Sequence, residues 1–341
     1  MNKKAFLKVL KYLLSLGLAF GILYFLFKNQ DPIKLIQEIQ KVEGKWVFFS
    51  MIFGGLAIVN RGLRWIVLID ALGYKASKQN SIAAVAILYF TNLFIPRGGE
   101  ISRCTVLAKA EKIPVDKLFG TILIERTIDF IFLFGLIFLT IIVKLNDIMN
   151  FYIAVQSQQT DSSNDKNIII LLIIISAVIM GIIAFKKGLK ESSFYTKILT
   201  FIEGLKEGFI SIKKMKQKST FWFHTFSIWI MYFLMTYICF FSMSETAHLT
   251  LADGLFLLVL GGIGMVIPTP GGIGSYHAIV MIGLSVLGVG TASFGPGGDT
   301  SNPALLFPTI IHAGQTLMAI IMGSIGLLIL FLSKKKKNVT S

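Results

Sequence analysis

The sequence has few charged residues and few cysteines, and no polar segment long enough to form a soluble domain. Only 15% of its 341 residues are charged, whereas soluble domains carry about 25%. Hydrophobic residues make up 54% of the chain. These values exclude an ordinary soluble fold and indicate a polytopic membrane protein.

Motifs for catalysis, metal binding and nucleotide binding are also missing. We find no His-Glu-x-x-His sequence, nucleophile elbow or phosphate-binding loop. The two cysteines, Cys104 and Cys239, lie in or beside apolar segments in opposite halves, which is typical of small buried residues. We therefore expect no metal, no cofactor and no disulfide.

The net charge of +15 would suggest a nucleic-acid partner in a soluble protein. Here the lysines cluster between apolar runs and at the ends of the chain, where they fix membrane topology. No folded basic module of a known nucleic-acid-binding kind is visible. We therefore expect the basic residues to interact with a membrane and not with nucleic acid.

A helix crosses a membrane with roughly 20 apolar residues. The sequence predicts an all-α polytopic membrane protein, a single domain over 1–341, with about seven full spans plus broken, re-entrant helical hairpins. No small-residue cleavage pattern precedes Lys28, so the first run is read as an uncleaved span. The long runs are 5–27, 46–69, 119–143, 168–185, 221–241 and 304–332.

The lysines predict the orientation of this fold. The basic linker 186–219 separates a first half, about 1–145, from a second half, about 167–333, and a basic tail follows at 333–341. Both basic segments, and both termini, are expected on the cytoplasmic side. The polar segment 146–167 is expected to be an outer loop.

Two matching Pro/Gly breaks interrupt short apolar runs, one in each half. They are Leu93-Phe-Ile-Pro-Arg-Gly-Gly-Glu-Ile-Ser-Arg103 and Val266-Ile-Pro-Thr-Pro-Gly-Gly-Ile-Gly-Ser-Tyr-His277. Proline removes an amide donor and glycine leaves the backbone unconstrained, so both end helices. Backbone broken at membrane depth needs protein or a water-filled cavity to satisfy it, and a matched pair of breaks favours an inverted-repeat transporter. The segments 251–267 and 275–290 could instead be two full spans.

Charged residues within the apolar runs are the other candidates. Glu125 and Asp129 lie four residues apart on one helix face, with Arg126 between them in sequence. A charge at this depth costs about 2.5 to 3.5 kcal/mol on insertion scales, so it should be paired or face water. Arg61 and Arg64, one turn apart, could be a pair that snorkels to the inner edge or a phosphate contact.

Three motifs carry a resemblance to a known family: Asn92-Leu-Phe-Ile-Pro-Arg-Gly-Gly-Glu-Ile-Ser-Arg103, Glu125-Arg-Thr-Ile-Asp129 and Pro268-Thr-Pro-Gly-Gly-Ile-Gly-Ser-Tyr276. At these motifs the chain resembles the lysylphosphatidylglycerol synthase transmembrane-region family. That family includes the flippase-like domain of multiple-peptide-resistance factors and stand-alone proteins. The resemblance implies a bacterial cytoplasmic-membrane protein that moves or holds a charged or glycosylated lipid. His277 stands where the family pattern leads us to expect an acid, and we expect no aminoacyltransferase domain of the kind that two-domain members carry.

We therefore predict a lipid flippase whose two broken hairpins shelter the polar head of a phospholipid or polyprenyl-type lipid. The alternatives are an intramembrane lipid-modifying enzyme, which the missing motifs disfavour, and a non-transporting subunit beside a lipid-synthesising enzyme. The candidate binding residues are Arg97, Gly98, Gly99, Glu100, Arg103, Glu125, Arg126, Asp129, Pro270, Gly271, Gly272, Gly274, Ser275, Tyr276 and His277, with Arg61 and Arg64 as secondary candidates.

Overall fold

A computed structural model describes residues 3–28, 30–157, 215–292 and 302–339. Its elements are helices throughout these ranges, without a strand, so the predicted all-α class is confirmed. The α-helices are α1 (Lys3–Phe27), α2 (Pro32–Lys41), α3 (Gly44–Ala71), α4 (Lys78–Phe94), α5 (Gly99–Glu111), α6 (Val115–Ser157), α9 (Lys218–Cys239), α10 (Leu251–Val266), α11 (Ser275–Val286) and α12 (Pro303–Val339), with short 3-10 turns η1 (Phe240–Ser242) and η2 (Pro270–Gly272).

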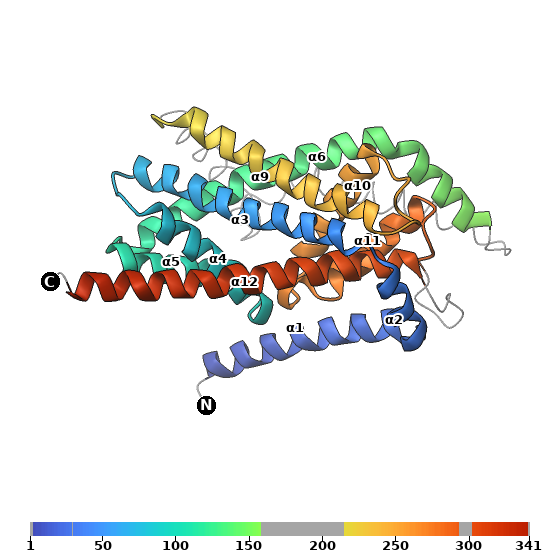
Figure 1. The fold of residues 1–341 in the computed structure, drawn as a ribbon, viewed down its shortest axis with the longest axis horizontal. Helices are drawn as coiled ribbons and strands as arrows, with labels where there is room; N and C mark the ends of the chain where they lie inside the picture. The colour runs from blue at the N-terminus through green and yellow to red at the C-terminus, as the bar shows by residue number, and fades with distance from the viewer. Residues whose placement is uncertain (1–2, 29, 158–214, 293–301, 340–341) are drawn as a thin grey trace, which may run out of the picture.

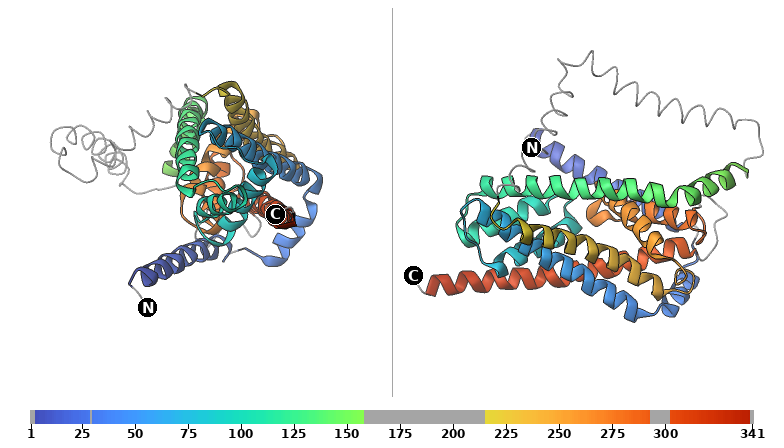
Figure 2. Two further views of the ribbon diagram at one scale, coloured as in Figure 1. Left: turned by 90° about the vertical axis from the view of Figure 1, so that its left-hand side faces the viewer. Right: turned by 90° about the horizontal axis from the view of Figure 1, so that it is seen from above.

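Four long helices are apolar enough to cross a membrane: α3, α6, α9 and α12. They run along the long axis of the molecule in both Figure 1 and Figure 2. A fifth candidate is α1 together with α2, which meet at a bend of 87°. The expected span 168–185 and most of the linker 186–219 lie outside the described residues, so the count of seven and the inverted repeat stay predictions.

One boundary differs from the prediction. The polar loop expected from Asn146 begins later, because α6 continues as helix to Ser157. Extending an existing helix gains one hydrogen bond for each residue that is fixed, so polar residues can prolong a long apolar helix that is already formed.

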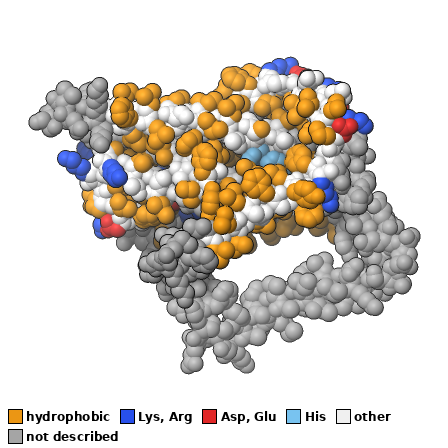
Figure 3. All heavy atoms as spheres, turned by 90° about the horizontal axis from the view of Figure 1, so that it is seen from below, with side chains coloured by type: hydrophobic (Ala, Val, Ile, Leu, Met, Phe, Trp, Pro, Cys, Tyr) orange, Lys and Arg blue, Asp and Glu red, His pale blue; other side chains and the backbone are white. Residues whose placement is uncertain are grey.

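The surface agrees with a membrane setting. In Figure 3 hydrophobic side chains cover the middle of the visible face, and the charged side chains of that face gather towards its two ends. Exposed apolar residues of the long helices include Phe134, Phe138 and Phe331. A wide apolar band between charged ends is what a lipid bilayer requires.

The first Pro/Gly break forms a helical hairpin from α4 and α5, which pack against each other. The 17 residues of α4 fall short of the roughly 20 that a crossing needs. Arg97 adopts a left-handed conformation with φ 59°, and the amide of Gly99 donates to Oδ1 of Asn92 over 2.8 Å. A Cβ on Gly99 would lie 2.3 Å from the carbonyl oxygen of Leu88, so only glycine permits this close turn.

The second break forms a matching hairpin from α10, η2 and α11. Its helices have 16 and 12 residues, which is short for two full spans. Gly271, Gly272 and Gly274 all have positive φ values, between 58° and 82°, and this backbone conformation favours glycine.

Each hairpin lies in its own hydrophobic core. The first core joins α3, α4, α5, α6 and α9 around Trp65, Leu107 and Phe221. The second joins α9, α10, α11 and α12 around Phe240 and Phe307. The long helix α12 packs on α3 and α4 as well as on α11, and therefore holds the two cores together.

Candidate functional site

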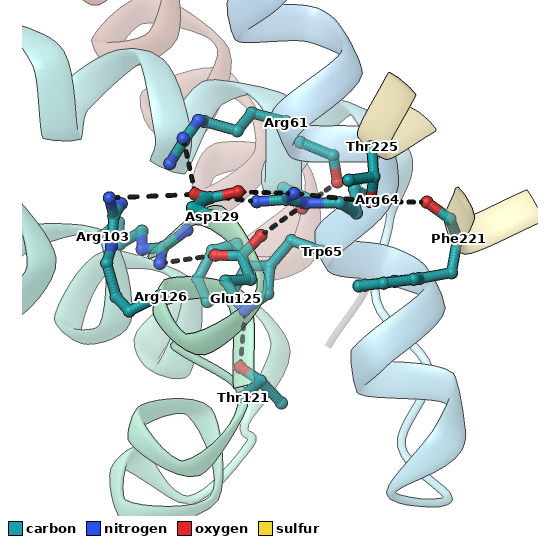
Figure 4. Close-up of polar contacts among 12 residues, drawn as sticks. Arg61, Arg64, Trp65, Arg103, Thr121, Glu125, Arg126, Asp129, Phe221 and Thr225 are labelled. Carbon is teal, nitrogen blue, oxygen red and sulfur yellow. Dashed lines mark hydrogen bonds and ion pairs between the residues drawn. The ribbon is translucent and has the colours of Figure 1, made fainter. Parts of the chain in front are cut away.

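A network of charged side chains lies inside the first core (Figure 4). It links four helices: α3, α5, α6 and, through a hydroxyl, α9. Its charged members are Arg61, Arg64, Glu100, Arg103, Glu125, Arg126 and Asp129, all of which the sequence singled out.

Asp129 forms ion pairs with two arginines of α3. Arg61 Nη2 lies 2.8 Å from Oδ2 of Asp129, and Arg64 Nη1 lies 2.8 Å from Oδ1. The arginines are one turn apart and so share a helix face. Their relative exposures are only 6% and 0%, so the interpretation as a pair that snorkels to the membrane edge is wrong. Pairing with Asp129 offsets the cost of burying both.

Glu125 is the innermost carboxylate of the network. Its Oε2 lies 2.7 Å from Nη2 of Arg103, its Oε1 lies 3.4 Å from Nε of Arg64, and all three side chains are fully buried. The guanidinium of Arg103 also lies over the ring of Trp65, 4.7 Å from the ring centroid. Three helices thus meet at Glu125, on the face of α6 that also carries Asp129.

The network reaches the surface at Glu100 and Arg126. Oε1 of Glu100 lies 2.6 Å from Nη2 of Arg126 and its Oε2 lies 2.7 Å from Nε of Arg103. Arg126 has a side chain that is 45% exposed, and that of Glu100 is 24% exposed. Four guanidinium groups face three carboxylates, so these seven residues carry one net positive charge.

Neutral partners that sequence reasoning missed complete the network. Nε of Arg61 donates to the hydroxyl of Tyr232 over 3.2 Å, and that hydroxyl pairs with Tyr89 over 2.8 Å. Thr225 lies 3.5 Å from Nη1 of Arg64. Nothing in the spacing of these residues distinguishes them from other polar groups in apolar helices, because they lie on α4 and α9 and reach the arginines of α3 only through tertiary packing.

The two broken tips meet each other rather than the ion network. Nη2 of Arg97, in the first tip, donates to the carbonyl of Val266 in the second over 2.8 Å. Leu93 packs on Gly271, where an added Cβ would lie 3.3 Å from the Leu93 side chain. Ser15 of α1 donates to the carbonyl of Pro268 over 2.5 Å. The opposing breaks of the two halves thus form one junction.

The remaining second-tip candidates gather around two histidines. The rings of His277 and His312 are 4.8 Å apart, and Tyr276 lies 5.4 Å from His312. Nε2 of His312 donates to the carbonyl of Gly271 over 2.9 Å, while Nδ1 of His277 is buried without a hydrogen-bond partner. Among the described residues no ion pair joins this group to the arginines.

The other second-tip candidates hold the turn together. Ser275 pairs its hydroxyl with that of Thr269 over 2.9 Å and donates to the carbonyl of Gly272. Pro270 begins η2, and Gly274 approaches the α1 backbone, since a Cβ there would lie 3.0 Å from the carbonyl oxygen of Ala19. In the first tip the amide of Gly98 bonds the carbonyl of Ile95. Within the described ranges no cluster of three or more metal-ligating side chains occurs.

The apolar helices, the broken hairpins and the buried ion network define an integral α-helical membrane protein. The family model described as "Lysylphosphatidylglycerol synthase TM region" matches residues 12–297. The chain belongs to this family, as its motifs indicated.

A curated relative supports the membrane class. The chain is 25% identical to "UPF0104 membrane protein MJ1595" of Methanocaldococcus jannaschii, in a match that covers 75% of this chain and 79% of the relative. No solved structure matches the chain.

Proposed function

We propose that this protein binds the anionic head group of a membrane lipid at the ion network and moves it across the bilayer. The observation that carries the proposal is the net positive charge of the network, which opens onto the membrane-facing surface at Arg126 and Glu100. An unbalanced charge in hydrocarbon is costly. A lipid phosphate would balance it.

The surroundings of Arg126 support a lipid as the ligand. Leu123, Arg126 and Phe130 follow one another at intervals of three and four residues, so they share one face of α6. Leu123 is 63% exposed and Phe130 46% exposed. A head group at Arg126 could therefore keep its acyl chains against apolar side chains.

The junction of the two tips supports movement rather than static binding. Both tips are short, broken segments, and transporters with inverted repeats form their substrate sites from broken helices and move one repeat against the other around them. Among the described residues a single side-chain hydrogen bond joins the two tips, from Arg97 to the carbonyl of Val266, and it would have to break for them to separate. The hairpins are proposed to enter the bilayer from opposite faces and to part when lipid passes.

The test is transport in reconstituted vesicles. The full chain is placed in liposomes with head-group-labelled lipids of three kinds: anionic, aminoacylated and polyprenyl-linked. Movement between leaflets is followed by quenching of the outer label. We expect movement of at least one phosphate-bearing lipid to be well above that in protein-free vesicles.

Variants link this movement to the network. Arg126→Gln is expected to slow lipid movement about tenfold, which corresponds to about 1.4 kcal/mol. Lys41→Gln, which also removes one exposed positive charge but lies on α2, is the matched control and should leave the rate unchanged. Vesicles as slow as protein-free ones for every lipid, or an undiminished Arg126→Gln rate, would refute the proposal.

A further inference from the structure

One carboxylate joins the exposed and the buried ends of the network. Glu100 contacts Arg126 with one oxygen, at 2.6 Å, and Arg103 with the other, at 2.7 Å. A carboxylate held in this way presents two anionic oxygens to two arginines. The two unesterified oxygens of a phosphodiester have the same charge and can make the same paired contacts.

The geometry around Arg103 is incomplete despite these short contacts. Its side chain is fully buried, yet none of its guanidinium nitrogens is aligned for a hydrogen bond, and Oε2 of Glu100 is likewise without one. Buried donors of this kind are rarely left unsatisfied, because each costs about 1–3 kcal/mol. The Glu100 carboxylate therefore satisfies the charge of Arg103 but not its hydrogen-bonding capacity.

The position of Glu100 makes its displacement feasible. It stands in the first turn of α5, directly after the Gly98–Gly99 turn, and its side chain is one-quarter exposed. Arg126, its outer partner, is the more exposed of the pair. A ligand arriving from the apolar face of α6 meets Arg126 first and reaches Arg103 only where Glu100 now lies.

We propose that Glu100 is an internal stand-in for the lipid phosphate, which competes with it for Arg103 and Arg126. This inference rests on the proposed function and deepens it, because it identifies the two arginines that receive the phosphate and the residue that opposes its entry. It also makes a prediction that a merely structural ion pair would not make. Removing the Glu100 charge should tighten lipid binding rather than weaken it.

The experiment titrates the purified full chain in detergent with dioleoyl phosphatidylglycerol and counts bound lipid by native mass spectrometry. Dioleoylglycerol, which lacks the phosphate, is the reference lipid. Glu100→Gln is expected to raise the phosphatidylglycerol affinity three- to tenfold, on the order of 0.7 to 1.4 kcal/mol. Arg126→Gln should lower the affinity about tenfold. Neither variant should change the weak binding of dioleoylglycerol.

Asp116→Asn is the matched control for Glu100→Gln. It removes one negative charge from the exposed first turn of α6, outside the network, and should leave the affinity within about twofold. A thermal melt of each variant shows whether it is folded. If Glu100→Gln does not fold, Glu100→Asp takes its place, because the shorter side chain keeps the charge but weakens the bridge, and its affinity should also rise.

The outcomes separate the two proposals. Phosphatidylglycerol binding by the wild type, with equal or weaker binding by folded Glu100→Gln or Glu100→Asp, overturns the stand-in role alone. Absence of phosphate-dependent binding in the wild type and in these variants overturns the stand-in role, whereas the proposed function falls separately, when the vesicle assay shows no movement of any of the three kinds of lipid. Tighter binding by Asp116→Asn of the same size as for Glu100→Gln would show a non-specific charge effect and would also overturn the stand-in role.

Discussion

Replacing Asp129 with asparagine tests whether the buried arginines depend on charge compensation. The substitution keeps the size of the side chain and removes its charge. Among the described residues Asp129 forms the only ion pair of Arg61, and it also pairs with Arg64. Removing one partner from a buried pair costs about 3–5 kcal/mol because the other charge stays buried. We expect Asp129→Asn to lower the free energy of unfolding by about 3 kcal/mol.

The assay is reversible unfolding in mixed micelles, followed by circular dichroism. The matched control is Asp147→Asn, whose side chain is 43% exposed and pairs with Lys144 at 2.8 Å. Such a partly exposed pair contributes at most about 1 kcal/mol. The control should therefore change the free energy of unfolding by no more than this amount.

A double variant then distinguishes charge compensation from lost packing. Combining Asp129→Asn with Arg61→Gln removes one charge of each sign. The combined loss should be smaller than the sum of the two single losses by at least about 1 kcal/mol, because the residues contact each other. A loss below about 1 kcal/mol for Asp129→Asn, or additive effects in the double variant, would refute the account of the network as a compensated set of buried charges.

Two further predictions concern the hairpin tips. Gly99→Ala should lower the free energy of unfolding by about 1–3 kcal/mol, since the new methyl group would lie 2.3 Å from the Leu88 carbonyl oxygen. The control Gly120→Ala, whose methyl group would meet nothing within 4 Å, should be neutral or stabilising by up to about 1 kcal/mol. Equal free energies of unfolding for the two variants would contradict this prediction. Arg97→Gln removes the contact with the Val266 carbonyl and should speed hydrogen exchange of the second tip without changing overall stability by more than about 1 kcal/mol; unchanged exchange would show that this contact does not hold the tips together.

The hairpins could be predicted because their causes are local. Pro96 and Pro268 stand two residues after the ends of α4 and α10, where the missing amide helps to end each helix. Glycines permit the left-handed turns of the second tip, whereas the left-handed residue of the first tip is Arg97. The approximate bounds of the long helices could be predicted for the same reason, because an apolar run can be recognised without knowing which helices pack beside it. The extension of α6 to Ser157 was missed because polar composition alone does not end a helix.

The partners of the charges could not be predicted in the same way. Arg61 and Asp129 lie 68 positions apart, and the sequence around Arg61 fits a snorkelling side chain equally well. Only the packing of α3 on α6 decides between the two. Tyr232 joins Arg61 for the same non-local reason.

The candidate site was predicted as one set, and the structure divides it. Glu100 and Arg103 are one helical turn apart on α5, so both turn into the ion network. Arg97 precedes the helix and points instead to the second tip. His277 lies with His312 in the other core. The helical spacing of Glu100 and Arg103 explains why they lie together, but only the tertiary contacts show where the two tips lie.

The ion network also constrains how the chain is inserted during synthesis. Arg61 and Arg64 leave the ribosome well before Asp129, their carboxylate partner 65 to 68 positions later. Until then α3 carries two uncompensated arginines, at a cost of roughly 5–7 kcal/mol on insertion scales. We therefore expect α3 to become more stable in the membrane once α6 joins it and supplies Asp129.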